Sequence, residues 1–154
     1  MPQLEKGGKF VFGISVIGHG GKVKIPPAAF NEYGLSDAES AILMNGSRTS
    51  GGFVLTTKRL IGSSLLADII YRAPGLVDYS LPEGETISYK NRQFGRTSIS
   101  DAGFIVLSPK ALSAYHLNIG DLLVAVRGSN TGITFIVKGP IWELAMHHPE
   151  VERF

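Results

Sequence analysis

Residues 21–33 read Gly-Lys-Val-Lys-Ile-Pro-Pro-Ala-Ala-Phe-Asn-Glu-Tyr, and residues 103–115 return to the pattern as Gly-Phe-Ile-Val-Leu-Ser-Pro-Lys-Ala-Leu-Ser-Ala-Tyr. The likeness extends without a gap from 12–55 to 94–137, an offset of 82, with twelve of 44 pairs identical. Two unrelated segments of average composition would share roughly three identical pairs over this length. The identical pairs are Phe12/Phe94, Gly13/Gly95, Ile17/Ile99, Gly21/Gly103, Pro27/Pro109, Ala29/Ala111, Tyr33/Tyr115, Leu35/Leu117, Gly46/Gly128, Ser47/Ser129, Thr49/Thr131 and Phe53/Phe135. We therefore expect the copies to pack about a pseudo-two-fold axis, as the subunits of a homodimer do.

Each repeat shows the same order of expected elements: strand, glycine turn, strand, short helix, turn and β-hairpin. Ser108 is a predicted N-cap, and Pro27 and Pro109 open the two helices. Gly34 and His116 take the position of a left-handed C-terminal cap. The predicted strands cover 9–17, 22–25, 41–44 and 53–55 in repeat 1, and 92–99, 104–107, 122–126 and 134–137 in repeat 2.

Helical patterns follow both hairpins. Apolar spacing predicts one amphipathic helix over 58–72 and a shorter one from 141 to about 147, stopped by Pro149. Residues 86–89 are a candidate extra strand. The chain is therefore divided into a first repeat with its helix (1–72), a connection (73–91) and a second repeat with its helix (92–154), expected to form one compact unit.

Composition sets limits on function. The 154 residues are 44% hydrophobic and carry 15 basic and 13 acidic residues, a net charge of +2 and no strong nucleic-acid footprint. The absence of cysteine excludes disulfides and thiolate chemistry. No apolar run approaches about 18 residues, so we expect a cytoplasmic protein without a membrane partner.

The motif Gly21-Lys-Val-Lys-Ile-Pro-Pro27 resembles the strand-into-helix signature of the AbrB/SpoVT/MazE swapped-hairpin superfamily, and 117–124, Leu-Asn-Ile-Gly-Asp-Leu-Leu-Val, resembles its Leu-x-x-Gly-Asp turn. The duplication is similar to the tandem arrangement of MraZ proteins. The resemblance covers 12–55 and 94–137. It implies a mainly β fold with short α-helices, in which two intertwined repeats form one swapped-hairpin β-barrel. It also implies a non-catalytic, AbrB-like transcriptional regulator that binds double-stranded DNA.

The DNA-contacting positions of that family are typically basic, because phosphates dominate DNA affinity. Lys22 holds the first such position, whereas repeat 2 has Phe104 there, and Lys110 stands at one helix start. Further basic residues flank aromatic Phe94 or lie near a hairpin tip. The predicted DNA-binding residues are Lys22, Lys24, Arg48, Lys90, Arg92, Arg96 and Lys110. Each also fits a solvated strand face or a charge-protected sheet edge.

The alternative is a ligand- or protein-binding module that kept the barrel and lost the basic surface. Phe104-Ile-Val-Leu107 is apolar on both faces, so it is expected to be buried on both or covered by a partner, including a second copy of the chain. Both hairpin tips contain Gly-Ser-x-Thr, which predicts either a wide turn or an anion- or ligand-binding loop. The loop residues are Gly46, Ser47, Thr49, Gly128, Ser129 and Thr131.

The sequence holds no recognisable catalytic constellation, so no enzyme activity, cofactor or metal is predicted. Gly18-His-Gly-Gly-Lys22 lacks the spacing of a phosphate-binding P-loop and is interpreted as a turn. His147 and His148 are adjacent and precede Pro149, which favours a solvated tail over a metal site.

Overall fold

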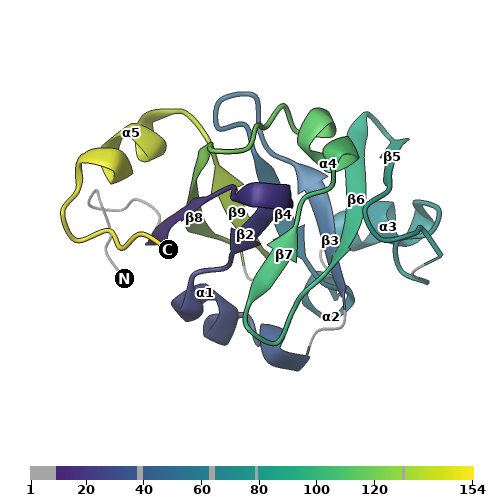
Figure 1. Ribbon diagram of the computed structural model, residues 1–154. Helices are drawn as coiled ribbons and strands as arrows, with labels where there is room; N and C mark the ends of the chain where they lie inside the picture. The colour runs from purple at the N-terminus through teal and green to yellow at the C-terminus, as the bar shows by residue number, and fades with distance from the viewer. Residues whose placement is uncertain (1–9, 38–39, 63–64, 79, 130) are drawn as a thin grey trace.

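The computed structural model describes residues 10–37, 40–62, 65–78, 80–129 and 131–154. In this part of the chain, nine antiparallel strands and five short α-helices confirm the mainly β class (Figure 1). The strands are β1 (Val11–Val16), β2 (Lys22–Lys24), β3 (Ser40–Asn45), β4 (Phe53–Thr56), β5 (Thr86–Tyr89), β6 (Arg92–Ser98), β7 (Phe104–Val106), β8 (Leu122–Ser129) and β9 (Gly132–Ile136). The α-helices are α1 (Pro27–Glu32), α2 (Lys58–Ile61), α3 (Leu65–Arg72), α4 (Pro109–Ala114) and α5 (Pro140–His147), and His19–Gly21 and Leu35–Asp37 are 3-10 turns.

The two repeats interleave in the sheets. The larger sheet has the order β1-β8-β9-β4-β3-β6-β5, and β2 pairs with β7 in a second, two-stranded sheet. Strands β1, β3 and β4 come from repeat 1, whereas β6, β8 and β9 come from repeat 2. The first strand of each repeat therefore pairs with the hairpin of the other repeat and not with the hairpin of its own repeat. No pairing within the described residues closes either sheet.

The strand registers show the expected pseudo-two-fold axis. Ile14 pairs with Val124, and the same pair shifted by 82 positions is Arg96 with Ile42, which is also observed. In the small sheet Val23 pairs with Ile105, its own counterpart at the same offset. A residue pairs with its own copy only where the axis passes between them, so the axis runs through the centre of β2 and β7.

The repeat is not gap-free in three dimensions, which corrects the sequence alignment at its end. Ile42 pairs with Thr56, but the equivalent Val124 pairs with Ile136 instead of Lys138. The second hairpin tip is therefore two residues shorter, and β9 begins at Gly132 instead of 134. The identity Phe53/Phe135 lies beyond this gap, so it does not mark equivalent places.

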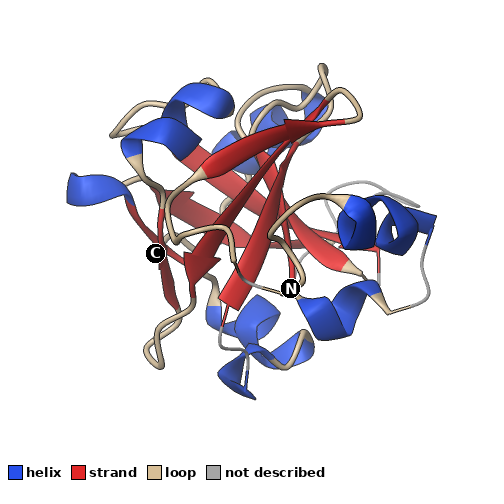
Figure 2. Ribbon diagram, turned by 90° about the vertical axis from the view of Figure 1, so that its right-hand side faces the viewer, coloured by secondary structure: helices blue, strands red, loops and turns tan. Residues whose placement is uncertain are grey.

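The main hydrophobic core lies between the two sheets and contains residues from both repeats. Val23 and Ile105, on the inner face of the small sheet, are 0% and 1% exposed. Each half of the large sheet also has a covered outer face. Helix α5 packs over β1 and β8 through Ala145, and Ile61 and Ile70 of α2 and α3 pack against β3 and β6. Figure 2 shows the helices around the outside of the strands.

Local signals explain most helix ends. The Ser108 hydroxyl accepts a hydrogen bond from the Ala111 N–H at 3.1 Å, as predicted for an N-cap. Gly34 and His116 both adopt left-handed conformations, with φ of 63° and 56°. The single helix predicted over 58–72 is wrong, because Gly62 at φ 42° ends α2 and α3 begins at residue 65. The predicted strand at 86–89 and the helix ending before Pro149 are confirmed.

Segments outside the repeats extend the large sheet at both ends. Strand β5 pairs with β6 at one end. At the other end, the Ile14 N–H donates to the Glu152 carbonyl at 2.8 Å, and the Phe154 N–H donates to the Ile14 carbonyl at 2.8 Å. The C-terminal segment thus occupies backbone groups on the free edge of β1, whereas β5 is the edge strand at the opposite end. Among the described helices, none has the length and apolar character needed to cross a membrane.

Candidate functional site

Strands β2 and β7 form a two-stranded ribbon with contrasting faces. Val23 and Ile105 point into the core, which leaves Lys22, Lys24, Phe104 and Val106 on the outer face. The Lys22 and Lys24 ammonium groups lie 4.1 and 4.7 Å from the centre of the Phe104 ring, within the range of cation–π contacts. Lys24 Nζ also donates a hydrogen bond to the Ala102 carbonyl.

The lysines explain how the chain tolerates an apolar β7. Phe104 was expected to be buried on both faces or covered by a partner, and instead it is half-buried beneath the two lysine side chains of β2. Long lysine stems can cover apolar surface while their charges stay in water. Val106 remains 48% exposed, so the expected contact of repeat 2 with a further chain stays a prediction.

A shallow groove of about 530 Å³ runs along the ribbon. Its rim carries the cationic side chains Lys22 and Lys24 together with His19 of the preceding turn. Its apolar walls come from Phe104 and from segments that the sequence reasoning did not connect with it. These further lining residues are Val16, Gly18 and Phe154.

The other predicted DNA-binding residues do not extend this surface. Lys110 forms an ion pair with Glu85 at 2.6 Å, which neutralises its charge. Arg96 donates to the Leu81 carbonyl at 2.6 Å and to the Ser40 hydroxyl at 2.9 Å, so it ties β6 to β3 and to the connection.

Two more predicted cations lie at the turn between β5 and β6. Lys90 has a left-handed φ of 52° in this turn, and Arg92 donates to the Met44 sulfur at 3.3 Å. Lys90 therefore lies in the turn beside the edge strand β5, whereas Arg92 lies on β6, an inner strand between β3 and β5. Of the seven predicted residues, the structure therefore brings Lys22 and Lys24 together on the ribbon.

The seventh, Arg48, lies at the first hairpin tip beside a cleft of about 570 Å³. Gly46 and Ser47 of the predicted ligand loop line the cleft, and Thr49 does not. The Ser47 hydroxyl accepts a hydrogen bond from the Ser50 N–H at 3.1 Å, which stabilises the wide turn. Of the two hydroxyl residues predicted at this tip, Ser47 therefore lines the cleft and Thr49 does not, and a ligand-binding role of the loop stays a prediction.

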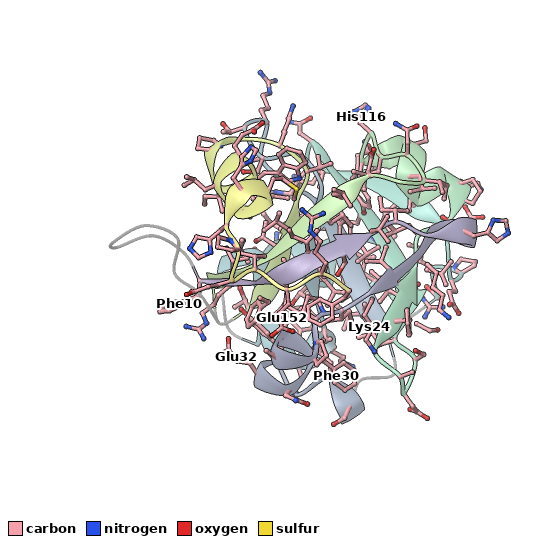
Figure 3. The ribbon with its side chains drawn as sticks, turned by 60° about the vertical axis from the view of Figure 1, so that its left-hand side comes forward. Phe10, Lys24, Phe30, Glu32, His116 and Glu152 are labelled. Carbon is pink, nitrogen blue, oxygen red and sulfur yellow. The ribbon has the colours of Figure 1, made fainter. Side chains whose placement is uncertain are left out.

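The opposite wall of this cleft is the end of α4. Tyr115 and His116 contribute from that end, and Lys138 follows β9. The sequence reasoning missed this grouping, although one signal was present: His116 occupies the left-handed position where repeat 1 has glycine. Figure 3 shows His116 and Lys24 at well separated places on the surface, so the cleft and the ribbon are distinct.

The second hairpin tip has a different geometry. Ser129 pairs with Gly132, whereas the last pair of the first hairpin is Asn45 with Phe53. The Thr56 hydroxyl donates to the Thr131 carbonyl at 2.5 Å, and the Ser129 hydroxyl lies outside the described part of the structure. Gly128 is tightly packed, since an added Cβ would lie 2.9 Å from the Gly132 carbonyl oxygen. The two predicted loops are thus not equivalent.

The pseudo-two-fold axis relates the cleft at α4 to a smaller one of about 390 Å³ at the end of α1. Here Arg127 Nη2 and Nε lie 2.5 and 2.8 Å from the Glu32 carboxylate oxygens. Arg59 Nη2 donates to the Tyr33 carbonyl at 2.6 Å. An added Cβ at Gly34 would lie 2.9 Å from the same Arg59 atom, so glycine makes room for this side chain.

The tyrosines beneath the two clefts are core residues, as predicted. Tyr115 donates from its hydroxyl to the Gln93 carbonyl at 3.2 Å, and its ring stacks on Phe53. Burial raises the pKa of the Tyr115 hydroxyl. Burial, aided by the nearby Glu32 carboxylate, also raises the pKa of Tyr33. Both hydroxyls are therefore held in the protonated form.

These raised pKa values predict alkaline unfolding. Unfolded tyrosine loses its proton near pH 10, whereas folded Tyr115 keeps it, so the free energy of unfolding falls as pH rises above about 10. The expected loss for Tyr115 is about 1.4 kcal/mol per pH unit. Urea unfolding between pH 9 and 11.5 measures it. Tyr115→Phe should make the decline shallower, and Tyr71→Phe, at a 50% exposed tyrosine, should not. Equal slopes in both variants would contradict the assignment.

The described residues contain no group of three or more His, Asp or Glu side chains placed to hold a metal ion. His148 Nδ1 accepts a hydrogen bond from the Glu150 N–H at 3.2 Å, a local contact of the chain end.

Comparison of the chain with protein-family models, with curated proteins and with solved structures finds no match.

Proposed function

We propose that this protein is a non-catalytic, AbrB-like regulator that binds double-stranded DNA through the outer face of the β2–β7 ribbon. The proposal includes a swapped-hairpin barrel as its architecture. Its support is the exchange of first strands between the repeats, together with the pairing of β2 and β7 across the pseudo-two-fold axis. Two strands joined in this way are what the swapped-hairpin arrangement requires.

One observation carries the DNA proposal. The ribbon is a two-stranded antiparallel element at the molecular surface, with two lysines and no carboxylate among its six residues. A two-stranded ribbon has the width that the major groove of B-DNA admits. Lysines can neutralise phosphates, while exposed apolar side chains such as Val106 can contact thymine methyl groups.

The proposed contact is asymmetric. Lys22 and Lys24 both lie on β2, and their counterparts on β7 are Phe104 and Val106. A symmetric pair of half-sites would require matching side chains from both repeats. We therefore expect the protein to bind a short, non-palindromic DNA site and to contact few of its phosphates.

The salt dependence of binding tests this proposal. Fluorescence anisotropy with labelled duplex DNA between 50 and 200 mM salt should give affinity that weakens with salt. The variant Lys22→Gln/Lys24→Gln keeps part of each side chain over Phe104. Because each phosphate contact contributes about 0.9 to the slope of log K against log salt, this variant should flatten the slope by about 2 and weaken binding roughly tenfold at 50 mM.

The matched control is Lys58→Gln/Arg72→Gln, which removes the same charge from exposed positions on α2 and α3. It should leave the slope within about 0.5 of the unmodified chain. Absence of DNA binding by the unmodified protein at 50 mM salt would refute the proposal and favour the ligand- or protein-binding alternative. Equal losses in the two double variants would show that the ribbon is not the contact surface.

A further inference from the structure

We propose that the cleft between the first hairpin tip and the end of α4 binds a small organic phosphate. This inference is independent of DNA binding, because it concerns a different part of the surface. With a volume of about 570 Å³, the cleft lies within the size range of small-molecule sites. Its walls come from segments far apart in the sequence: the loop 46–52, Gln93 of β6, the α4 end and residues 137–138.

The charged side chains of the cleft favour an anionic ligand. Arg48, His116 and Lys138 line it, and no lining residue is acidic. Within the described chain, no hydrogen bond or ion pair engages these three side chains. Three cationic or titratable side chains that line one cleft without a counter-charge attract an anionic ligand. An arginine fork together with a lysine point charge suits the several oxygens of a phosphate.

The related cleft at α1 contains an acidic side chain that the cleft at α4 lacks. There, the Glu32 carboxylate pairs with Arg127, so the protein supplies its own anion. In the cleft at α4 the equivalent positions hold Ala114 and Asn45. The scaffold is thus the same in both halves, but the cleft at α1 contains a carboxylate that pairs with Arg127, whereas no lining residue of the cleft at α4 is acidic.

The cleft at α4 also differs from the cleft at α1 in its hairpin tip and in the residue that ends its helix. Hairpin tip 1 is two residues longer than tip 2, and its backbone forms one wall. His116 adopts a φ of 56°, a conformation that its counterpart Gly34 reaches without strain. This left-handed backbone position beside the cleft supports a role for the His116 side chain in binding.

The remaining lining favours an organic body on the phosphate. Val137 and Ala114 provide apolar contacts, and Gln93 provides an amide. Pockets for small organic ligands combine such apolar surface with a few polar groups that fix orientation. Inorganic phosphate should therefore bind more weakly than a phosphate carrying an apolar ring.

A titration of the ¹⁵N-labelled protein with phenyl phosphate tests the site. Saturable shifts of the backbone amides of Ser47, His116 and Lys138 are expected in two-dimensional NMR spectra. Inorganic phosphate should shift the same amides at higher concentration. Benzoate should bind at least about tenfold more weakly than phenyl phosphate, since its carboxylate has fewer oxygens for the cations. Equal affinity for benzoate would overturn the phosphate assignment.

Three variants locate the binding. Arg48→Gln/Lys138→Gln should weaken phenyl phosphate binding at least about tenfold, because it removes two charge-assisted contacts. Ala114→Glu should abolish saturable binding by supplying the carboxylate that Glu32 provides in repeat 1, a position where the fold already accepts glutamate. Arg59→Gln, in the cleft at α1, is the matched control and should leave the affinity unchanged.

The outcomes separate this proposal from the DNA proposal. Lys22→Gln/Lys24→Gln should retain phenyl phosphate binding, whatever its effect on DNA. Shifts distributed over all surface cations, or equal losses in the Arg48/Lys138 and Arg59 variants, would overturn the phosphate site.

Discussion

Phe53→Ala is expected to lower the free energy of unfolding by about 3–5 kcal/mol, the range measured for fully buried phenylalanines. Phe53 and Phe135 are both 0% exposed, and their stacked rings lie 4.9 Å apart between centroids. Strand β4 pairs with β9 at this point, so the pair joins the two repeats at the centre of the large sheet. Urea unfolding followed by circular dichroism measures the loss.

A double-mutant cycle tests whether the rings stabilise each other. Phe135→Ala alone should cost a similar amount, and the double variant should cost about 0.5–1.5 kcal/mol less than the sum. Phe30→Ala, at a partly buried phenylalanine packed against the same core, is the control and should cost less than half as much. A loss at Phe53 no larger than that at Phe30 would contradict its central place in the core.

Gly21→Ala is expected to destabilise the protein by about 3 kcal/mol or more. Gly21 has a φ of 84°, and an added Cβ would lie 2.0 Å from the Leu107 carbonyl oxygen. The Gly21 carbonyl also accepts a hydrogen bond from the Leu107 N–H at 2.8 Å, at the end of the β2–β7 ribbon. In the Gly21→Ala variant, the backbone at residue 21 must therefore move away from Leu107, at the place where the two repeats meet.

The duplication supplies the control for this prediction. Gly103, the counterpart of Gly21, has a φ of 83°, but the nearest atom to an added Cβ lies at 3.5 Å, on Phe30. Gly103→Ala should therefore cost only the left-handed backbone strain, about 1–2 kcal/mol. Thermal and urea unfolding of both variants would compare the costs. Similar losses would show that backbone strain, and not the approach to Leu107, decides the requirement for glycine.

Residues that the two repeats share form the core, whereas residues that differ between them form the candidate binding surfaces. Residues retained in both copies, such as Tyr33 and Tyr115, lie in the shared core. Residues that differ between copies decide the surfaces: Lys22 and Lys24 lie opposite Val106 and Phe104 in the ribbon. Glu32 of the cleft at α1 is replaced by Ala114 in the cleft at α4. This divergence accounts for one basic strand and one open cleft in a molecule whose backbone is nearly symmetric.

Local patterns predicted the strands and the short helices, because they depend on neighbouring residues. Alternation in Lys22-Val-Lys24 and the Ser108–Pro109 helix start are examples that the structure confirms. The break at Gly62 was missed, since the apolar spacing of 58–72 continues across it. The shortened second tip was missed because twelve identities favoured an alignment without a gap.

The sequence by itself determined the duplicated scaffold, since its glycines, prolines and apolar periods act within a few residues of the backbone. Tertiary structure decided which side chains share a surface. Arg96 and Lys110 resemble free cations in the sequence, but partners 15 and 25 residues away engage them. Arg48, His116 and Lys138 meet only because interleaved strands bring distant segments together. Charge and hydrogen bonding act through space, so their partners follow from chain topology and not from residue spacing.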